Sequence, residues 1–172
     1  MGSISTFEIL AEVSIGLAGF GSIAIVLAQG RREMRPEDRF RALGLYFSSL
    51  GALFLALLPI GIAHTHADEI LLWQLSSSAM AVYIVFITLA IVRMRARYLP
   101  QEHYGGPLLT AFITITTIIN LAAQMINVAA WPHVPHASPY YFGVIWFLGY
   151  GCIFFMRLMF HQPRENSDED VV

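Results

Sequence analysis

Every basic residue of this 172-residue chain is an arginine, and the ten arginines fall into three clusters separated by long apolar passages. The clusters span residues 31–41, 93–97 and 157–164. Two apolar passages lie between successive clusters, so a chain that crosses a bilayer at each passage returns every cluster to the same side. Arginine-rich loops mark the cytoplasmic side of a membrane protein. The pattern predicts an all-α polytopic membrane protein with its N-terminus outside and its C-terminus in the cytoplasm.

The composition supports this fold class, because 56% of the residues are hydrophobic and only 13% are charged, which is more apolar than a soluble domain requires. A membrane span needs about 20 apolar residues. We place spans at residues 7–29, 42–63, 70–92, 108–130 and 141–160. The short connections predict a compact bundle of antiparallel neighbours over residues 1–161. The acidic tail, residues 162–172, is expected to be a disordered cytoplasmic segment.

Local signals suggest where the helices begin. Pro36, Pro107 and Pro139 suit the first turn of a helix, where the missing N–H of proline costs nothing. The segments 5–8 and 65–68 fit the capping box, in which a hydroxyl and a carboxylate satisfy free backbone donors. The N-terminal sequence lacks the basic region of a signal peptide, so we expect the first helix to be retained.

The fourth span carries a continuous row of polar side chains, called here the polar stripe. Its members recur every three or four residues and therefore share one helix face: Thr110, Thr114, Thr117, Asn120, Gln124 and Asn127. An amide in hydrocarbon must find a partner, which is either a neighbouring helix or water in a path through the membrane. Gln74 and Ser78 of the third span, with Ser76 and Ser77, are the expected partners. Both interpretations of the stripe stay open at this point.

Acidic and histidine residues collect at the predicted outer side. They form an expected vestibule of Glu8, Glu12, His64, His66, Asp68, His133 and His136. Carboxylates there would attract cations, and the histidines would make the vestibule sensitive to pH. A divalent transition metal is the alternative ligand, held by His133, His136, His64 and His66. Glu12 lies one turn deeper than Glu8 and is either functional within the membrane or reaches back to the interface.

The second span contains a column of small residues spaced by four: Gly44, Ser48, Ala52 and Ala56. Small side chains allow two helix backbones to approach closely, either within one bundle or between copies of the chain. Pro59 in the same span is expected to kink the helix or to free a backbone carbonyl.

No catalytic motif occurs in the sequence, so we expect no enzyme activity and no resident cofactor. The leading hypothesis is a homo-oligomeric membrane protein that provides a path for a small cation or proton along the polar stripe. The first alternative is a non-transporting subunit or scaffold that binds other membrane proteins through the same stripe. The second alternative is a sensor or carrier of metal at the outer face. Nucleic acid is not an expected partner, and the lysine-free clusters favour a bacterial inner membrane.

Overall fold

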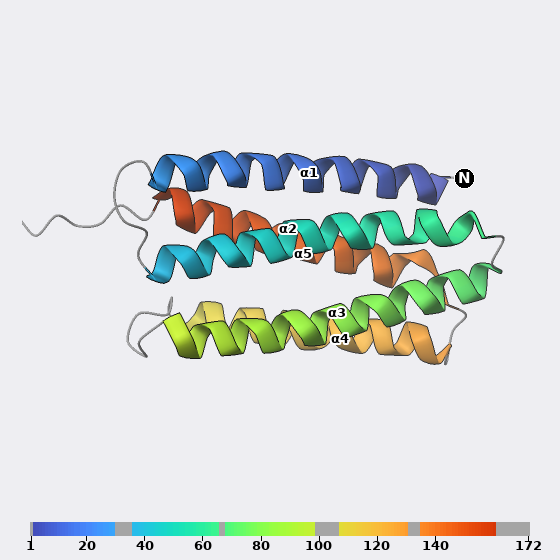
Figure 1. The fold of residues 1–172 in the computed structure, drawn as a ribbon. Coiled ribbons are helices and arrows are strands. Elements are labelled where there is room, and N and C mark those ends of the chain that lie inside the picture. Colours follow the sequence, from blue (N-terminus) through green and yellow to red (C-terminus); the bar gives the residue numbers. More distant parts are fainter. Residues whose placement is uncertain (1, 30–35, 66–67, 99–106, 131–134, 161–172) are drawn as a thin grey trace, which may run out of the picture.

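The computed structural model describes residues 2–29, 36–65, 68–98, 107–130 and 135–160, and within these ranges the regular secondary structure is entirely α-helical. The helices are α1 (Gly2–Gln29), α2 (Pro36–Ala63), α3 (Glu69–Tyr98), α4 (Pro107–Ala129) and α5 (Ala137–Phe160). They run alternately up and down in one bundle (Figure 1). Each described helix is long and apolar enough to cross a membrane. The all-helical prediction is confirmed, and the chain fits a small integral membrane protein.

The prolines mark helix starts as predicted. Pro36 and Pro107 are the first residues of α2 and α4, and Pro139 is the third residue of α5. Each one therefore occupies a first turn, whose N–H groups have no partner within the helix. At the arginine-bearing side, α2 and α3 extend by more than a turn beyond the predicted spans 42–63 and 70–92.

The two predicted capping boxes are wrong. Helix α1 already begins at Gly2, so the segment 5–8 lies inside it. The backbone N–H and the hydroxyl of Thr65 both donate to the carbonyl of Ile62, at 2.9 and 2.7 Å, and this bonding closes the end of α2. Asp68 directly precedes α3, and its carbonyl accepts a hydrogen bond from the N–H of Leu72 at 2.9 Å. Thr65 therefore ends one helix instead of starting the next.

Helix α2 forms the centre of the packing, because it contacts α1, α5 and α3. Helix α4 contacts α3 and α5 and lies at the edge of the bundle. The largest fully buried side chains include Tyr140, Phe7 and Phe147, so an aromatic core joins α1 to α5. The ring centroids of Phe7 and Tyr140 are 5.7 Å apart. In contrast, all three buried residues of α4 are polar, which makes the docking of this helix depend on hydrogen bonds.

The small-residue column of α2 faces the interior of its own bundle. All of its members are buried: Gly44, Ser48, Ala52 and Ala56. A Cβ atom on Gly44 would lie 2.7 Å from the ring of Phe154, and one on Gly151 would lie 3.7 Å from the Cβ atom of Ser48. Of the two uses predicted for the column, the structure shows packing within one chain, between α2 and α5.

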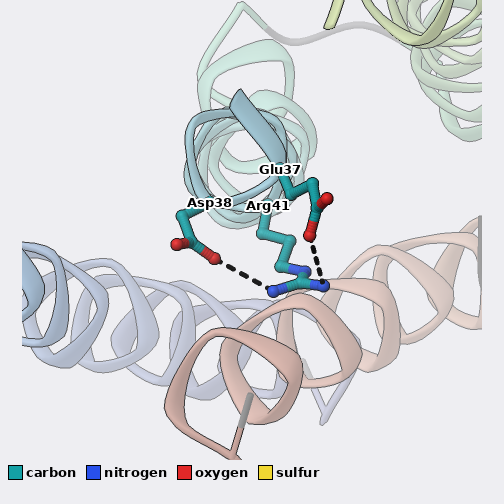
Figure 2. Close-up of polar contacts among 3 residues, drawn as sticks. All are labelled: Glu37, Asp38 and Arg41. Carbon is teal, nitrogen blue, oxygen red and sulfur yellow. Dashed lines mark hydrogen bonds and ion pairs between the residues drawn. The ribbon is translucent and has the colours of Figure 1, made fainter. Parts of the chain in front are cut away.

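The described arginines gather at one end of the bundle, which we call the arginine end (Figure 1). They are Arg39, Arg41, Arg93, Arg95, Arg97 and Arg157. The opposite end, with His64, Asp68 and His136, is called the histidine end. Figure 2 shows that Arg41 is held within its own helix, with its guanidinium 2.9 Å from the carboxylate of Asp38 and 3.9 Å from that of Glu37. These spacings of three and four residues place the opposite charges on one helix face.

Candidate functional site

The polar stripe of α4 divides into two halves with different surroundings. Near the histidine end, Asn120, Gln124 and Asn127 are buried. Near the arginine end, Thr110 and Thr117 are half-buried and Thr114 is exposed. The sequence pattern is the same in both halves, but the neighbouring helices approach only one of them closely.

Asn127 joins three helices through one amide group. Its Nδ2 donates to the hydroxyl of Ser77 at 2.7 Å and to the carbonyl of His136 at 3.2 Å. Its Oδ1 accepts the backbone N–H of His136 at 3.0 Å. Ser77 belongs to α3, and His136 directly precedes α5. The amide therefore holds α4 against α3 and fixes the start of α5.

Gln124 links α4 to α5 a turn deeper. Its Nε2 donates to the Oδ1 of Asn120 at 3.1 Å and to the carbonyl of Pro139 at 2.9 Å. The Oε1 of Gln124 and the Nδ2 of Asn120 are buried and have no hydrogen-bond partner within the described ranges. A Cβ atom on Gly143 of α5 would lie 3.1 Å from the Oδ1 of Asn120, so the two helices are in close contact here.

The bond of Asn127 to Ser77 confirms one predicted partner on α3, and two other predicted partners differ in what they contact. The Nε2 of Gln74 donates to the carbonyl of Val128 at 3.1 Å and so holds the end of α4. The hydroxyl of Ser78 instead donates to the carbonyl of Gln74, at 2.7 Å, on its own helix. Gln74 thus adds a further bond between α3 and α4. In the histidine-end half, the stripe is occupied by hydrogen bonds between helices.

The arginine-end half of the stripe lines a cavity of about 350 Å³, called here the α3–α4 cavity. Its walls come from residues 84–95 of α3, 110–121 of α4, 146–150 of α5 and Ser48 of α2. The stripe contributes Thr110, Thr114 and Thr117 to this wall. In Figure 1, α3 lies near α2 at their connected ends and diverges from it towards the arginine end.

The polarity of the cavity wall is low, because most of the lining side chains are aliphatic or aromatic. The hydroxyl of Thr114 donates to the carbonyl of Thr110 at 2.9 Å, and that of Thr117 to the carbonyl of Ile113 at 2.7 Å. Both hydroxyls are therefore used within α4 itself. Arg95 is the one charged residue among those that line the cavity. The threonine pattern was the sequence signal for this wall, whereas the contribution of Ser48 was not predicted.

The predicted vestibule residues are spread over separate surfaces of the histidine end. Glu8 and Glu12 are exposed on α1, and Asp68 and His136 are exposed beside α3 and α5. The Nδ1 of His64 lies 2.7 Å from the carbonyl of Ile60 in its own helix. His66 and His133 lie outside the described residues. Within the described ranges, no three histidine, cysteine or acidic residues come together as metal ligands would. The metal site stays a prediction.

No family model, curated protein or solved structure matches this chain. The chemistry of the candidate site therefore rests on its own residues. The stripe supplies neutral amides and hydroxyls, and most of these groups already bond to protein atoms. The cavity supplies an apolar wall with few polar groups, which is the usual character of a site that binds a small molecule. This arrangement is suited to binding.

Proposed function

We propose that this small integral membrane protein binds an apolar or lipid-like molecule in the α3–α4 cavity. The cavity itself is the observation that carries the proposal. Its volume of about 350 Å³ falls at the lower end of the range found for small-molecule sites, about 300–1,000 Å³. Its wall is mainly hydrocarbon, and the polar groups on it are few and placed at particular points, as ligand orientation requires.

The same geometry disfavours the cation path predicted from the polar stripe. Among the residues that line the cavity, the one charged side chain is Arg95, so the wall offers no carboxylate that would attract a cation. Towards the histidine end the stripe is filled by the bonds of Asn127 and Gln124 to neighbouring helices. A path through one chain would have to break these bonds. Conduction of a cation or proton remains a prediction, with flux measurements as its test.

Part of the rim of the cavity would face lipid. Val85, Leu89, Val92 and Ile118 line the cavity and are also exposed on the bundle surface. We place the arginine end in the cytoplasm, following the distribution of arginine in membrane proteins. The ligand would then enter sideways from the cytoplasmic leaflet, and for a bacterial protein this is the inner leaflet of the cytoplasmic membrane.

The proposal is tested by extracting the protein with its surrounding lipid into polymer-bounded discs and recording its native mass. We expect the chain to carry a bound molecule in fixed stoichiometry. Thr117→Phe would fill the cavity and remove that molecule. Thr116→Phe is the matched control, because Thr116 is also half-buried and also bonds to its own helix, yet it does not line the cavity.

Other results of the native-mass measurement would overturn the proposal. A ligand-free homo-oligomer that conducts ions would restore the path hypothesis. A fixed complex with a second protein and no bound small molecule would favour the subunit hypothesis. Retention of the bound molecule by Thr117→Phe at the level of Thr116→Phe would place its site elsewhere on the protein.

A further inference from the structure

Ser48 presents a hydroxyl group to the α3–α4 cavity near the middle of the bundle. It is only 1% exposed and it lines the cavity. It follows Pro36 by twelve residues of helix, about 18 Å along the axis at 1.5 Å per residue. Its hydroxyl has no hydrogen bond to any described residue. The mainly apolar wall of the cavity thus includes a buried residue whose hydroxyl has unused bonding capacity.

Few polar groups in the described helices lack a partner in this way, among them the hydroxyl of Ser76 and the Nε1 of Trp146, which also lines the cavity. Other hydroxyls in the helices bond back to the carbonyl four residues earlier, as serine and threonine commonly do in apolar surroundings. Examples are Ser14, Ser22, Ser49, Ser78 and Thr88, with donor to acceptor distances of 2.7–2.9 Å. The adjacent Ser49 bonds to the carbonyl of Leu45 at 2.7 Å. Two consecutive serines of α2 therefore use their hydroxyl groups differently, and only Ser48 of the two lines the cavity.

The packing of α2 against α5 places Ser48 on the cavity wall. Gly151 of α5 lies against it, since a Cβ atom built on Gly151 would lie 3.7 Å from the Cβ atom of Ser48, an ordinary van der Waals contact. The rings of Trp146 and Tyr150 also line the cavity, and they lie tilted against each other with their centroids 4.4 Å apart. A buried hydroxyl without a partner costs free energy, which a ligand atom can recover by bonding to it.

We infer that Ser48 recognises the ligand, and that the cavity takes a neutral apolar molecule with a carbonyl-type oxygen at its deep end. This inference rests on the proposed function. The hydroxyl of Ser48 would donate to that oxygen, while the apolar body lies along the walls of α3 and α4. The deep end excludes an ionised group, because no charged side chain lines it and a charge near the middle of a membrane is costly.

The test uses Trp146 as a reporter on the cavity wall. Replacing Trp73 and Trp131 by phenylalanine leaves Trp146 as the one tryptophan of the chain. The protein is placed in phosphatidylcholine nanodiscs and titrated with bromododecanone, a ketone, and with bromododecane, which has the same apolar body without the oxygen. Bromine quenches tryptophan fluorescence on contact, so binding in the cavity gives a saturable loss of signal.

The matched variants are Ser48→Ala and Ser49→Ala, which remove the same atom from neighbouring positions. We expect Ser48→Ala to weaken ketone binding roughly three- to tenfold, the worth of one neutral hydrogen bond, and to leave bromododecane binding unchanged. Ser49→Ala should change neither affinity. Ser48→Cys, which keeps a weak donor, should fall between the parent and Ser48→Ala.

Two kinds of failure are distinguishable. If neither probe gives saturable quenching of Trp146, the proposed function is wrong and the inference falls with it. If both probes bind but Ser48→Ala affects them equally, or not at all, the cavity binds apolar molecules and the role of Ser48 is wrong. If Ser49→Ala weakens binding of the ketone as much as Ser48→Ala does, the effect is a general one of altering α2, and the inference is also overturned.

Discussion

The hydroxyl of Tyr140 on α5 donates a 2.6 Å hydrogen bond to the backbone carbonyl of Leu55 on α2. Leu55 is four residues before Pro59, and in an α-helix that carbonyl would accept the N–H of residue 59. Proline has no N–H to give. Tyr140 therefore supplies from a neighbouring helix the donor that Pro59 lacks. The sequence predicted a carbonyl freed by Pro59, and the structure identifies its partner.

Tyr140→Phe should lower the free energy of unfolding by about 1–2 kcal/mol, because it leaves the carbonyl of Leu55 buried without a donor. In a Pro59→Ala background the cost should be smaller, since residue 59 then provides its own N–H. Reversible unfolding in mixed micelles measures both values as a double-mutant cycle. Tyr141→Phe is the matched control on the same helix. Equal costs of Tyr140→Phe in both backgrounds would contradict this account of the bond.

Gly51→Ala should destabilise the bundle by about 1–3 kcal/mol, the usual cost of overpacking a core. A Cβ atom there would collide with the ring and hydroxyl of Tyr83, which donates to the carbonyl of Phe47 at 2.5 Å. Gly61→Ala on the same helix meets no neighbouring atom within 4 Å and should be neutral or slightly stabilising. Thermal denaturation of the two variants provides the comparison. A neutral Gly51→Ala would show that Tyr83 has room to move.

Gln124→Leu should reduce stability by about 1 kcal/mol, since hydrogen bonds between membrane helices are individually modest. It removes the donor to Asn120 and to the carbonyl of Pro139. Hydrogen exchange of α4 should rise, because this helix buries only polar residues. Thr114→Val, at an exposed position of the stripe, is the control. Loss of cation flux in liposomes with unchanged stability would instead support a path along the stripe.

Ser48→Ala should stabilise the ligand-free protein by up to about 1 kcal/mol, because it removes a buried hydroxyl that has no partner. Ser49→Ala should be neutral or slightly destabilising, since its hydroxyl is already bonded within α2. Denaturant unfolding of delipidated protein measures both effects. A loss of stability in Ser48→Ala would mean that the hydroxyl contributes to the fold itself.

The proposed orientation predicts which end is accessible from outside the cell. In a Cys152→Ser background, the chain has no other cysteine and single reporters are informative. Asp68→Cys should react with an impermeant maleimide in intact cells, whereas Arg97→Cys should react only after lysis. Both positions are exposed, so differences in labelling report their side of the membrane. The reverse labelling pattern would place the arginine end outside.

The helices could be predicted from the amino-acid sequence, because the signals for them are local. Apolar length predicts each span, proline marks the starts of α2 and α4, and the spacing of Asn120, Gln124 and Asn127 predicts that they share one face. The capping box predicted at residues 5–8 was wrong because α1 begins earlier, at Gly2. The one predicted at residues 65–68 was wrong because Thr65 bonds to the preceding helix, a choice between two neighbours that composition does not resolve.

The partners of the individual polar groups, in contrast, could not be predicted without the packing of the helices. The stripe looks uniform in sequence, yet Asn127 bonds to α3 and to the residue before α5, whereas Thr117 lines a cavity. Likewise Ser48 and Ser49 are identical neighbours, and one faces the cavity while the other bonds to its own helix. These outcomes depend on how α2, α3 and α5 approach one another, which is set by packing between residues far apart in the chain.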